Sequence, residues 1–359
     1  MLILIVANKG SNHAKKVAGG LAERGHDVVF ASPNDVVDKS VILDPRIKLV
    51  TLPYGGKFGY ILNSFALRTL YNKVKPDVVN VHYASGCGML AMLSGVKPKV
   101  LSCYGSDIFE FPRLNKFNNW LLKRILKNAD ALASTSHAMA DEIRNLLPGY
   151  EKEIAITPFG VDTELFKPYP RETSNSPLVV GIVKTLSPIY DIDLLLRAFA
   201  IICQSVKPLP VLRIFGDGPS KSHLIQLAAD LNISDHVEFR GRVSNEDVPL
   251  ELNQMDVFVN CSKQESFGVN ILEAMACGLP VVATDCVGPR ELILDGKSGI
   301  IVKDRKPDSL ATEIIKLLKD PKLRDSMGSA GRERVCDSYD WNKNVFDLER
   351  VLDNNKKVI

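Results

Sequence analysis

The sequence predicts an α/β protein built from two doubly wound parallel-sheet domains. Its 359 residues are enough for about two domains with separate cores. Short apolar segments alternate with amphipathic ones along both halves, as in parallel strands joined by crossover helices. The alternation lapses between residues 158 and 177, where prolines, glycines and polar residues gather. We therefore expect an N-terminal domain at residues 1–165, a second domain at 166–338, and a terminal helix within 339–359 that packs back towards the first domain.

The first half opens with a strand–helix–strand unit. An apolar strand is expected at residues 2–7, an amphipathic helix at 13–24 and a second strand at 28–32. The apolar opening is too short for a signal peptide and no basic residue precedes it, so we interpret it as a buried strand. Further strands, each separated by enough chain for a crossover helix, are expected at residues 47–52, 77–81, 99–103 and 131–134.

The second half repeats the alternation after the proline-rich stretch. Its expected strands are residues 178–184, 211–215, 237–240, 257–261, 280–284 and 300–302. Its expected helices are residues 192–205, 220–231 and one that starts at Val269. From Asp308 the chain is expected to form three helices, with breaks at Pro321 and near residues 339–341.

Composition narrows the function classes. Lys and Arg total 45 against 42 Asp and Glu, a formal net charge of only +3, so we expect no nucleic-acid partner. Seven cysteines without a Cys-x-x-Cys pair favour reduced thiols in a cytosolic compartment and argue against a metal site. No segment approaches the roughly 20 apolar residues that span a bilayer. We therefore expect a cytoplasmic protein whose contact with a membrane, if any, is peripheral.

Residues 265–280 form the most informative segment, because two carboxylates frame the start of a helix there. Backbone N–H groups at Gly268, Val269 and Asn270 can hold a phosphate at the positive end of the helix dipole. Glu273, one turn into the helix, could accept hydrogen bonds from ribose hydroxyls, and Glu265 could contact the hydroxyls of a sugar. An ordinary capped helix with acids near its start is the alternative.

A glycosidase acid–base pair fits this segment less well. Eight helical residues rise about 12 Å, whereas the two carboxyl groups of glycosidases lie roughly 5 to 9.5 Å apart.

The segment Glu-x7-Glu followed by AMACGLPVVAT closely resembles the donor-site signature of the retaining family 4 glycosyltransferases. Other segments resemble that family in the same order, so the similarity covers nearly the whole chain. They are ERGHDV around His26, HYASG at 82–86, Gly105-Ser106-Asp107, PFGVDTELF at 158–166, FGDGP at 215–219 and the WN-containing tail. The resemblance implies the GT-B fold, in which two Rossmann-like domains face each other across a cleft.

The same resemblance implies transfer of a sugar from a nucleoside diphosphate sugar, with UDP expected, to a glycan or lipid-linked acceptor. It further implies retention of the anomeric configuration, no metal and no cofactor, in cell-surface polysaccharide or glycolipid synthesis. Alternatives are a GT-B sugar-nucleotide epimerase or phosphorylase, and a non-catalytic nucleotide-sugar-binding partner of an active transferase.

Residue roles follow from the same match. Glu265, Lys184 and Asp107 are assigned to catalysis. The acceptor side is assigned His82 and His13. Donor binding is assigned to Glu273, Phe267, Gly268, Val269, Asn270, Gly10, Gly216, Asp217, Arg240 and Val243.

One departure from the family pattern concerns the cations on the donor phosphates. The family places an Arg and, five residues later, a Lys where this sequence has Thr185 and Tyr190. Lys184 lies one residue early, at the end of a strand, and can supply a cation from a shifted register. A second Lys, expected near Ile189, is absent from the sequence.

Several assigned residues have structural alternatives. The single Gly10 and the Gly216-Asp217-Gly218 turn can be required by loop geometry alone. Asp107 can cap a helix, and His82 can be a buried histidine with satisfied hydrogen bonds. Asp191-Ile192-Asp193 superficially resembles a metal-binding Asp-x-Asp motif, but we interpret it as a helix start.

Residues 113–127 form a basic amphipathic segment. Five basic side chains alternate with apolar ones, and no acidic residue occurs among them. Such a segment can hold a protein reversibly at the inner face of the cytoplasmic membrane, where a lipid-linked acceptor lies. The alternative is a helix packed on the core with a solvated charged face.

Overall fold

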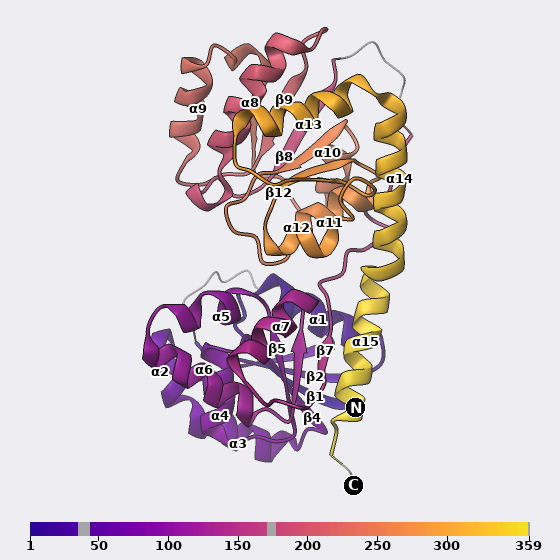
Figure 1. The fold of residues 1–359 in the computed structure, drawn as a ribbon. Helices are drawn as coiled ribbons and strands as arrows, with labels where there is room; N and C mark the ends of the chain where they lie inside the picture. The colour runs from indigo at the N-terminus through magenta and orange to yellow at the C-terminus, as the bar shows by residue number, and fades with distance from the viewer. Residues whose placement is uncertain (35–43, 171–176, 358–359) are drawn as a thin grey trace. The chain divides into compact units, whose positions relative to one another are not determined.

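The computed structural model describes residues 1–34, 44–170 and 177–357. The chain divides into two compact units, of which unit 1 is Met1–Pro158 with Asn342–Ile359 and unit 2 is Phe159–Trp341 (Figure 1). Each unit is a parallel sheet with helices on its faces, which confirms the predicted α/β class. The polar run 171–176 of the expected linker lies outside the described residues.

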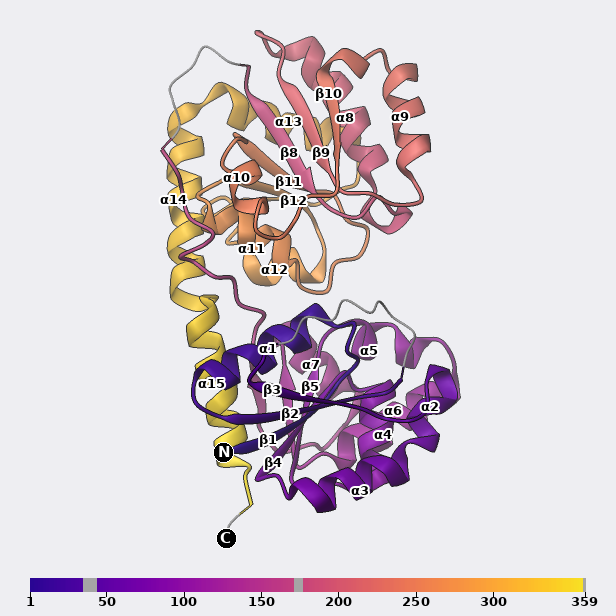
Figure 2. The same ribbon diagram turned by 180° about the vertical axis from the view of Figure 1, so that it is seen from behind.

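Unit 1 contains a seven-stranded sheet in the order β3-β2-β1-β4-β5-β6-β7, with every pair parallel. The order reverses beside β1, so the loops after β1 and β4 border a switch point (Figure 2). The strands are β1 Leu2–Val6, β2 Asp27–Ser32, β3 Ile47–Thr51, β4 Val78–His82, β5 Lys99–Cys103, β6 Ala131–Ser134 and β7 Ile154–Ile156. The helices are α1 Asn12–Glu23, α2 Gly56–Leu62, α3 Ser64–Val74, α4 Gly86–Ser94, α5 Ser106–Phe109, α6 Lys116–Asn128, α7 His137–Leu146 and, at the end of the chain, α15 Trp341–Asn354.

Helix α15 contacts the turn between α1 and β2 in unit 1. Glu349 accepts hydrogen bonds from Arg24 and from Nε2 of His26, the latter at 2.9 Å. His26, noted in the sequence as part of the family-like ERGHDV segment, thus has a structural partner.

Unit 2 contains a six-stranded parallel sheet in the order β10-β9-β8-β11-β12-β13. Its strands are β8 Val179–Val183, β9 Val211–Phe215, β10 Val237–Gly241, β11 Val257–Asn260, β12 Val281–Thr284 and β13 Ile300–Val302. Its helices are α8 Ile192–Ser205, α9 Lys221–Asp230, α10 Val248–Leu252, α11 Val269–Ala276, α12 Val287–Leu292, α13 Pro307–Lys319 and α14 Pro321–Ser338. Because strand side chains alternate between faces, Val180 and Ile182 join one apolar core and Val179 joins the other.

The boundary of unit 2 lies earlier than residue 166. Val161 pairs with Asp340, and Phe166 is buried in a core of unit 2. Arg332 of α14 donates to the carbonyl of Phe166 at 3.0 Å, so residues 159–166 pack with the second unit.

No helix within residues 1–34, 44–170 and 177–357 is both long and apolar enough to cross a bilayer.

Candidate functional site

The candidate donor site lies where the sheet order of unit 2 reverses, between β8 and β11. Loops 184–191 and 261–268 leave the carboxyl ends of these two strands, and the second loop leads into α11. Open parallel sheets bind ligands at such a switch point, because the loops diverge and leave room between them.

Gly268 starts helix α11 in a left-handed conformation, with φ +100°. A Cβ at this position would lie 3.0 Å from Cδ1 of Ile271 and in a backbone region that side chains rarely adopt. The side chain of Asn270 then ties the helix start to the sheet, donating to the carbonyl of Val183 at 3.1 Å and accepting from Asn260 at 3.3 Å. The first backbone N–H groups of α11 are thereby fixed at the ends of β8 and β11.

Lys184 and Glu265 form an ion pair at this site, with 2.5 Å between Nζ and Oε2. Their side chains are only 15% and 12% exposed. The Lys184 ammonium also lies 4.4 Å from the centre of the Tyr190 ring, a cation–π contact. Tyr190, which stands where the resemblance leads us to expect a lysine, therefore helps to hold Lys184.

The Gly216-Asp217-Gly218 turn packs backbone to backbone against the loop that begins with Lys184. A Cβ at Gly216 would lie 1.9 Å from the carbonyl oxygen of Lys184, and one at Gly218 would lie 2.4 Å from that of Leu186. The carbonyl of Asp217 accepts from the backbone N–H of Leu186 at 3.1 Å. These glycines thus set the position of Lys184.

A second charge cluster beside the site was missed by sequence reasoning. Asp191 pairs with Arg305 at 2.5 Å and with Lys263 at 3.5 Å. Arg305 also donates to the carbonyls of Ser262 and Cys261, at 2.8 and 2.9 Å. Asp191 occupies the N-cap position of α8 without capping it through its side chain, because its carboxylate is used to join the two loops. The sequence signal that could have indicated this cluster is that each of its residues follows the carboxyl end of an expected strand.

The other assigned donor residues differ in exposure. Phe267 is 2% exposed and packs edge-on against Phe159 and Tyr339, so its side chain belongs to a core of unit 2. Glu273 lies half-buried on α11. Arg240 is exposed at the end of β10, and Val243 packs against a core of unit 2.

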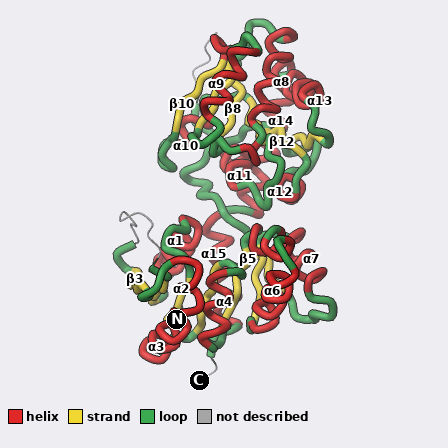
Figure 3. Tube along the Cα trace, turned by 90° about the vertical axis from the view of Figure 1, so that its left-hand side faces the viewer, coloured by secondary structure: helices red, strands yellow, loops and turns green. Residues whose placement is uncertain are grey.

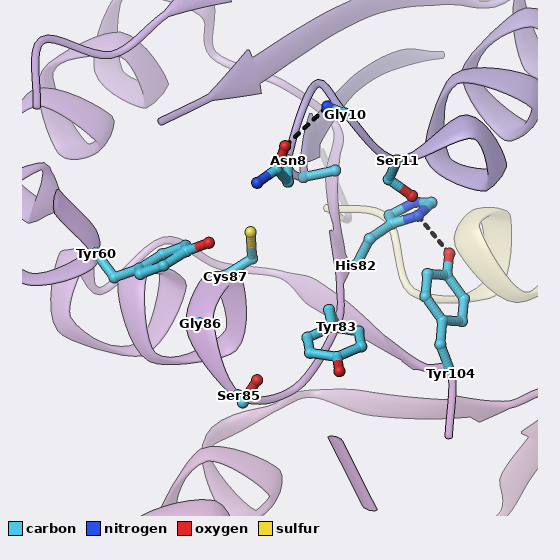
Figure 4. Close-up of a pocket in the computed structure, with 11 residues that line it drawn as sticks. Asn8, Gly10, Ser11, Tyr60, His82, Tyr83, Ser85, Gly86, Cys87 and Tyr104 are labelled. Carbon is cyan, nitrogen blue, oxygen red and sulfur yellow. Dashed lines mark hydrogen bonds between the residues drawn. The ribbon is translucent and has the colours of Figure 1, made fainter. Parts of the chain in front are cut away.

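Unit 1 has a pocket of about 550 Å³ at its own switch point (Figure 4). The loops after β1, β4 and β5 form it, together with Tyr60 of α2. The residues that line it include no Asp, Glu, Lys or Arg. They are Ala7, Asn8, Gly10, Ser11, Tyr60, His82, Tyr83, Ser85, Gly86, Cys87 and Tyr104. Tyr83 has φ +79°, a conformation that is costly for a bulky residue and is often found at functional sites.

His82 is buried in this pocket as a neutral imidazole. Nε2 donates to Oδ1 of Asn80 at 2.7 Å, so Nδ1 accepts from the hydroxyl of Tyr104 (Figure 4). Burial lowers the pKa of His82 to about 3. His13 packs its ring edge-on against Tyr104, and desolvation, followed by the charges of His82 and Lys16, holds the pKa of His13 well below its ordinary value. The structure thus brings His82 and His13, both assigned to the acceptor side, to the same tyrosine.

Asp107 occupies a structural position. It is fully buried, and its carboxylate accepts from the backbone N–H groups of Ala84, Gly105 and Tyr104 at 2.7, 2.8 and 3.1 Å. Burial raises its pKa although these hydrogen bonds act in the opposite direction. The carboxylate of Asp107 therefore joins the loops after β4 and β5, and its assignment to catalysis stays a prediction.

Gly10 lies in the exposed turn before α1, and its N–H donates to Oδ1 of Asn8 at 2.7 Å. The amide expected to approach a diphosphate is therefore already used within the turn.

Solved structures share this architecture. The sucrose-phosphate synthase of Thermosynechococcus elongatus matches with a TM-score of 0.83 and 20% identity, covering 99% of this chain and 98% of the other. The HepE protein of Anabaena, solved in complex with UDP and glucose, matches with a TM-score of 0.81 and 19% identity, covering 99% and 100%. Two Rossmann-like units with this architecture define the GT-B fold.

Family comparison gives the particular group. The model for glycosyl transferases group 1 matches residues 167–334, and the glycosyl transferase 4-like model matches residues 2–136. The GDP-mannose-dependent alpha-(1-6)-phosphatidylinositol monomannoside mannosyltransferase of Mycolicibacterium smegmatis is 31% identical over 281 residues, 74% of this chain and 72% of the relative. The N-acetyl-alpha-D-glucosaminyl L-malate synthase of Bacillus anthracis is 29% identical over 352 residues, covering 92% and 90%. The chain belongs to the group 1 glycosyl transferases and is an enzyme of the hexosyl-transferring class.

Proposed function

We propose that this enzyme is a retaining, metal-independent glycosyltransferase that uses a nucleoside diphosphate sugar, with UDP as the nucleotide. Its acceptor is a glycan or lipid-linked sugar in cell-surface polysaccharide or glycolipid synthesis. The observation that carries the proposal is the start of α11, which Gly268 and Asn270 fix between the ends of β8 and β11, beside Lys184 and Glu265. The UDP and glucose bound by the structurally similar HepE protein support this choice of donor.

The donor phosphates are assigned to the first turn of α11. Its backbone N–H groups and the positive end of its dipole stabilise the negative charge that develops on the distal phosphate as the sugar leaves. Glu273, one turn further along, accepts the ribose hydroxyls. We assign the stabilisation of this charge to the helix and to Lys184.

Lys184 and Glu265, paired with each other here, can each bind a part of the donor instead. Without a donor, the two charges neutralise each other in a site of low solvent exposure. A bound phosphate offers Lys184 a second anion, and the carboxylate of Glu265 can then accept hydroxyls of the transferred sugar. Recognition of phosphate and of sugar would be linked through this one ion pair.

The acceptor is assigned to the pocket of unit 1. Tyrosine rings, hydroxyls and a neutral His82 suit the faces and hydroxyls of a sugar. Because His82 uses both ring nitrogens and has a pKa of about 3, it positions Tyr104 rather than taking a proton at neutral pH. The acceptor hydroxyl attacks on the face from which the phosphate leaves, without an enzyme nucleophile.

The test is a thermal-shift screen against UDP, GDP, ADP and dTDP, followed by their sugars, since stabilisation follows ligand affinity. We expect UDP to stabilise the protein most, and Glu273→Gln to weaken that stabilisation. Glu333→Gln, which changes an exposed carboxylate on α14, is the matched control and should behave like the wild type. Unchanged affinity and turnover in folded Glu273→Gln would refute the donor-site assignment.

The same assays separate this function from the two alternatives that the sequence left open. A non-catalytic donor-binding partner would bind nucleotide without turnover against any acceptor, whereas an epimerase would convert the donor when no acceptor is present.

A further inference from the structure

Unit 1 exposes large apolar side chains on one of its sides. Helices α2 and α3 pack against α4, which packs against α6, and Figure 3 shows all four facing the viewer in this unit. Seven large hydrophobic side chains among the described residues are more than half exposed, and six of them lie on these helices or just before α6. These six, here called the apolar patch, are Phe58, Leu62, Phe65, Leu114, Phe117 and Trp120.

The patch is carried by elements that are anchored in the fold. Where α2 meets α3, the buried amide of Asn63 donates to the carbonyl of Tyr54 at 2.7 Å and accepts from its N–H at 3.1 Å. Helix α6 buries Leu122 against the core and turns Phe117 and Trp120 outward, with 5.7 Å between their ring centres. The exposure is therefore a property of packed helices.

The charged residues of the helices that form this side of unit 1 are all basic. The sequences of α2, α3, α4 and α6 contain seven Lys or Arg residues and no Asp or Glu, although the whole chain has a net charge of only +3. The guanidinium of Arg124 lies 5.1 Å from the centre of the Trp120 ring, so apolar and basic groups are interleaved.

We propose that the apolar patch docks on the surface of an anionic lipid bilayer. Aromatic side chains partition into the interface of a bilayer, while Lys and Arg contact the acidic headgroups. A second copy of this chain fits the patch poorly, because a two-fold contact would place these cations against the same cations.

Helix α2 links the patch to the pocket of unit 1. Tyr60 lines the pocket and packs on Gly86, where an added Cβ would lie 2.8 Å from its ring, while Phe58 and Leu62 face solvent. A lipid-linked acceptor would keep its chain in the bilayer while its sugar enters the pocket. This last step rests on the proposed function, whereas the docking surface itself does not.

Vesicle co-sedimentation of the whole protein tests the surface. The wild type should sediment with vesicles that contain phosphatidylglycerol but not with phosphatidylcholine alone, and salt should weaken the binding. Phe65→Ser combined with Phe117→Ser should bind roughly tenfold more weakly. Ile225→Ser combined with Leu250→Ser, which changes two exposed apolar residues of unit 2, is the matched control and should bind like the wild type.

Unchanged melting temperatures of both double variants show that folding is intact. The proposal is overturned if the wild type does not bind anionic vesicles at low salt, or if both double variants lose vesicle binding equally. It is also overturned if the patch variant instead abolishes self-association or RNA binding. Nucleotide binding in the thermal-shift screen is a separate readout, so loss of vesicle binding with intact nucleotide binding refutes the docking surface alone.

Discussion

Gly216→Ala should damage the donor site because the added Cβ meets the loop that carries Lys184. The glycine has φ +135°, and a Cβ there would lie 1.9 Å from the carbonyl oxygen of Lys184. The left-handed conformation alone costs about 1–2 kcal/mol for alanine, and relief of the overlap adds about 1–3 kcal/mol. The loop that begins at Lys184 must move, because the clash is with backbone rather than with a flexible side chain.

Gly241→Ala separates these two contributions. Gly241 also has a positive φ, +74°, but no atom lies within 4 Å of its added Cβ. At about 2–4 °C per kcal/mol for a unit of this size, we expect scanning calorimetry of the whole chain to show a loss of roughly 2–8 °C for Gly241→Ala and roughly 4–20 °C for Gly216→Ala. Nucleotide affinity should fall only in Gly216→Ala. Equal losses of stability in the two variants, or intact nucleotide affinity in Gly216→Ala, would refute the reasoning.

Three further predictions concern charged and titratable groups. Lys184→Gln should destabilise unit 2 by about 1–3 kcal/mol because Glu265 loses its partner. Adding Glu265→Gln should restore the stability measured by urea unfolding. The affinity of the double variant for nucleoside diphosphates should stay about 10- to 150-fold lower than that of the wild type. The pKa of His82 is about 3 in the fold and near 6.5 in the unfolded chain, so the unfolded chain binds the extra proton between these values. The contribution of His82 to stability should therefore fall with decreasing pH by up to about 1.4 kcal/mol per pH unit, and a pH series of melting curves should show a slope smaller by up to this amount for His82→Gln. Arg305→Gln should cost about 1.5–3 kcal/mol in urea unfolding through its hydrogen bonds to Asp191 and two carbonyls, and an unchanged midpoint would contradict the proposed tie between the loops.

The buried strands and long helices could be predicted from the sequence because their apolar periodicity is local. The expected strand at 131–134 is β6 and the expected helix at 192–205 is α8, with the same limits. Strand β7 was not predicted, since its three residues are too few to show a pattern. Helices α2 and α3 were not placed either, because the apolar residues on their exposed sides obscure the usual division between a core face and a polar face.

The candidate site was predictable only where its residues are close in sequence. The segment from Glu265 to Glu273 could be interpreted directly, because a helix start and its flanking acids lie within nine consecutive residues. The contact of Asp191 with Arg305 joins residues 114 positions apart and depends on the strand order, which one sequence does not determine. For Asp107, the sequence did not reveal the three backbone donors around its carboxylate, because one of them, Ala84, follows another strand.

Contacts between residues far apart in sequence also change the interpretation of the altered phosphate-binding motif. Judged from the sequence, Thr185 and Tyr190 leave the site one cation short. In the fold, the Tyr190 ring contacts the ammonium of Lys184. Lys263 follows β11 and Arg305 follows β13, and both pair with Asp191 in the loop after β8. Cationic groups are therefore retained around the loop after β8, although they no longer come from the positions of the motif. Since electrostatic stabilisation depends on where charge lies rather than on which segment supplies it, the substitutions at 185 and 190 are compatible with an active donor site.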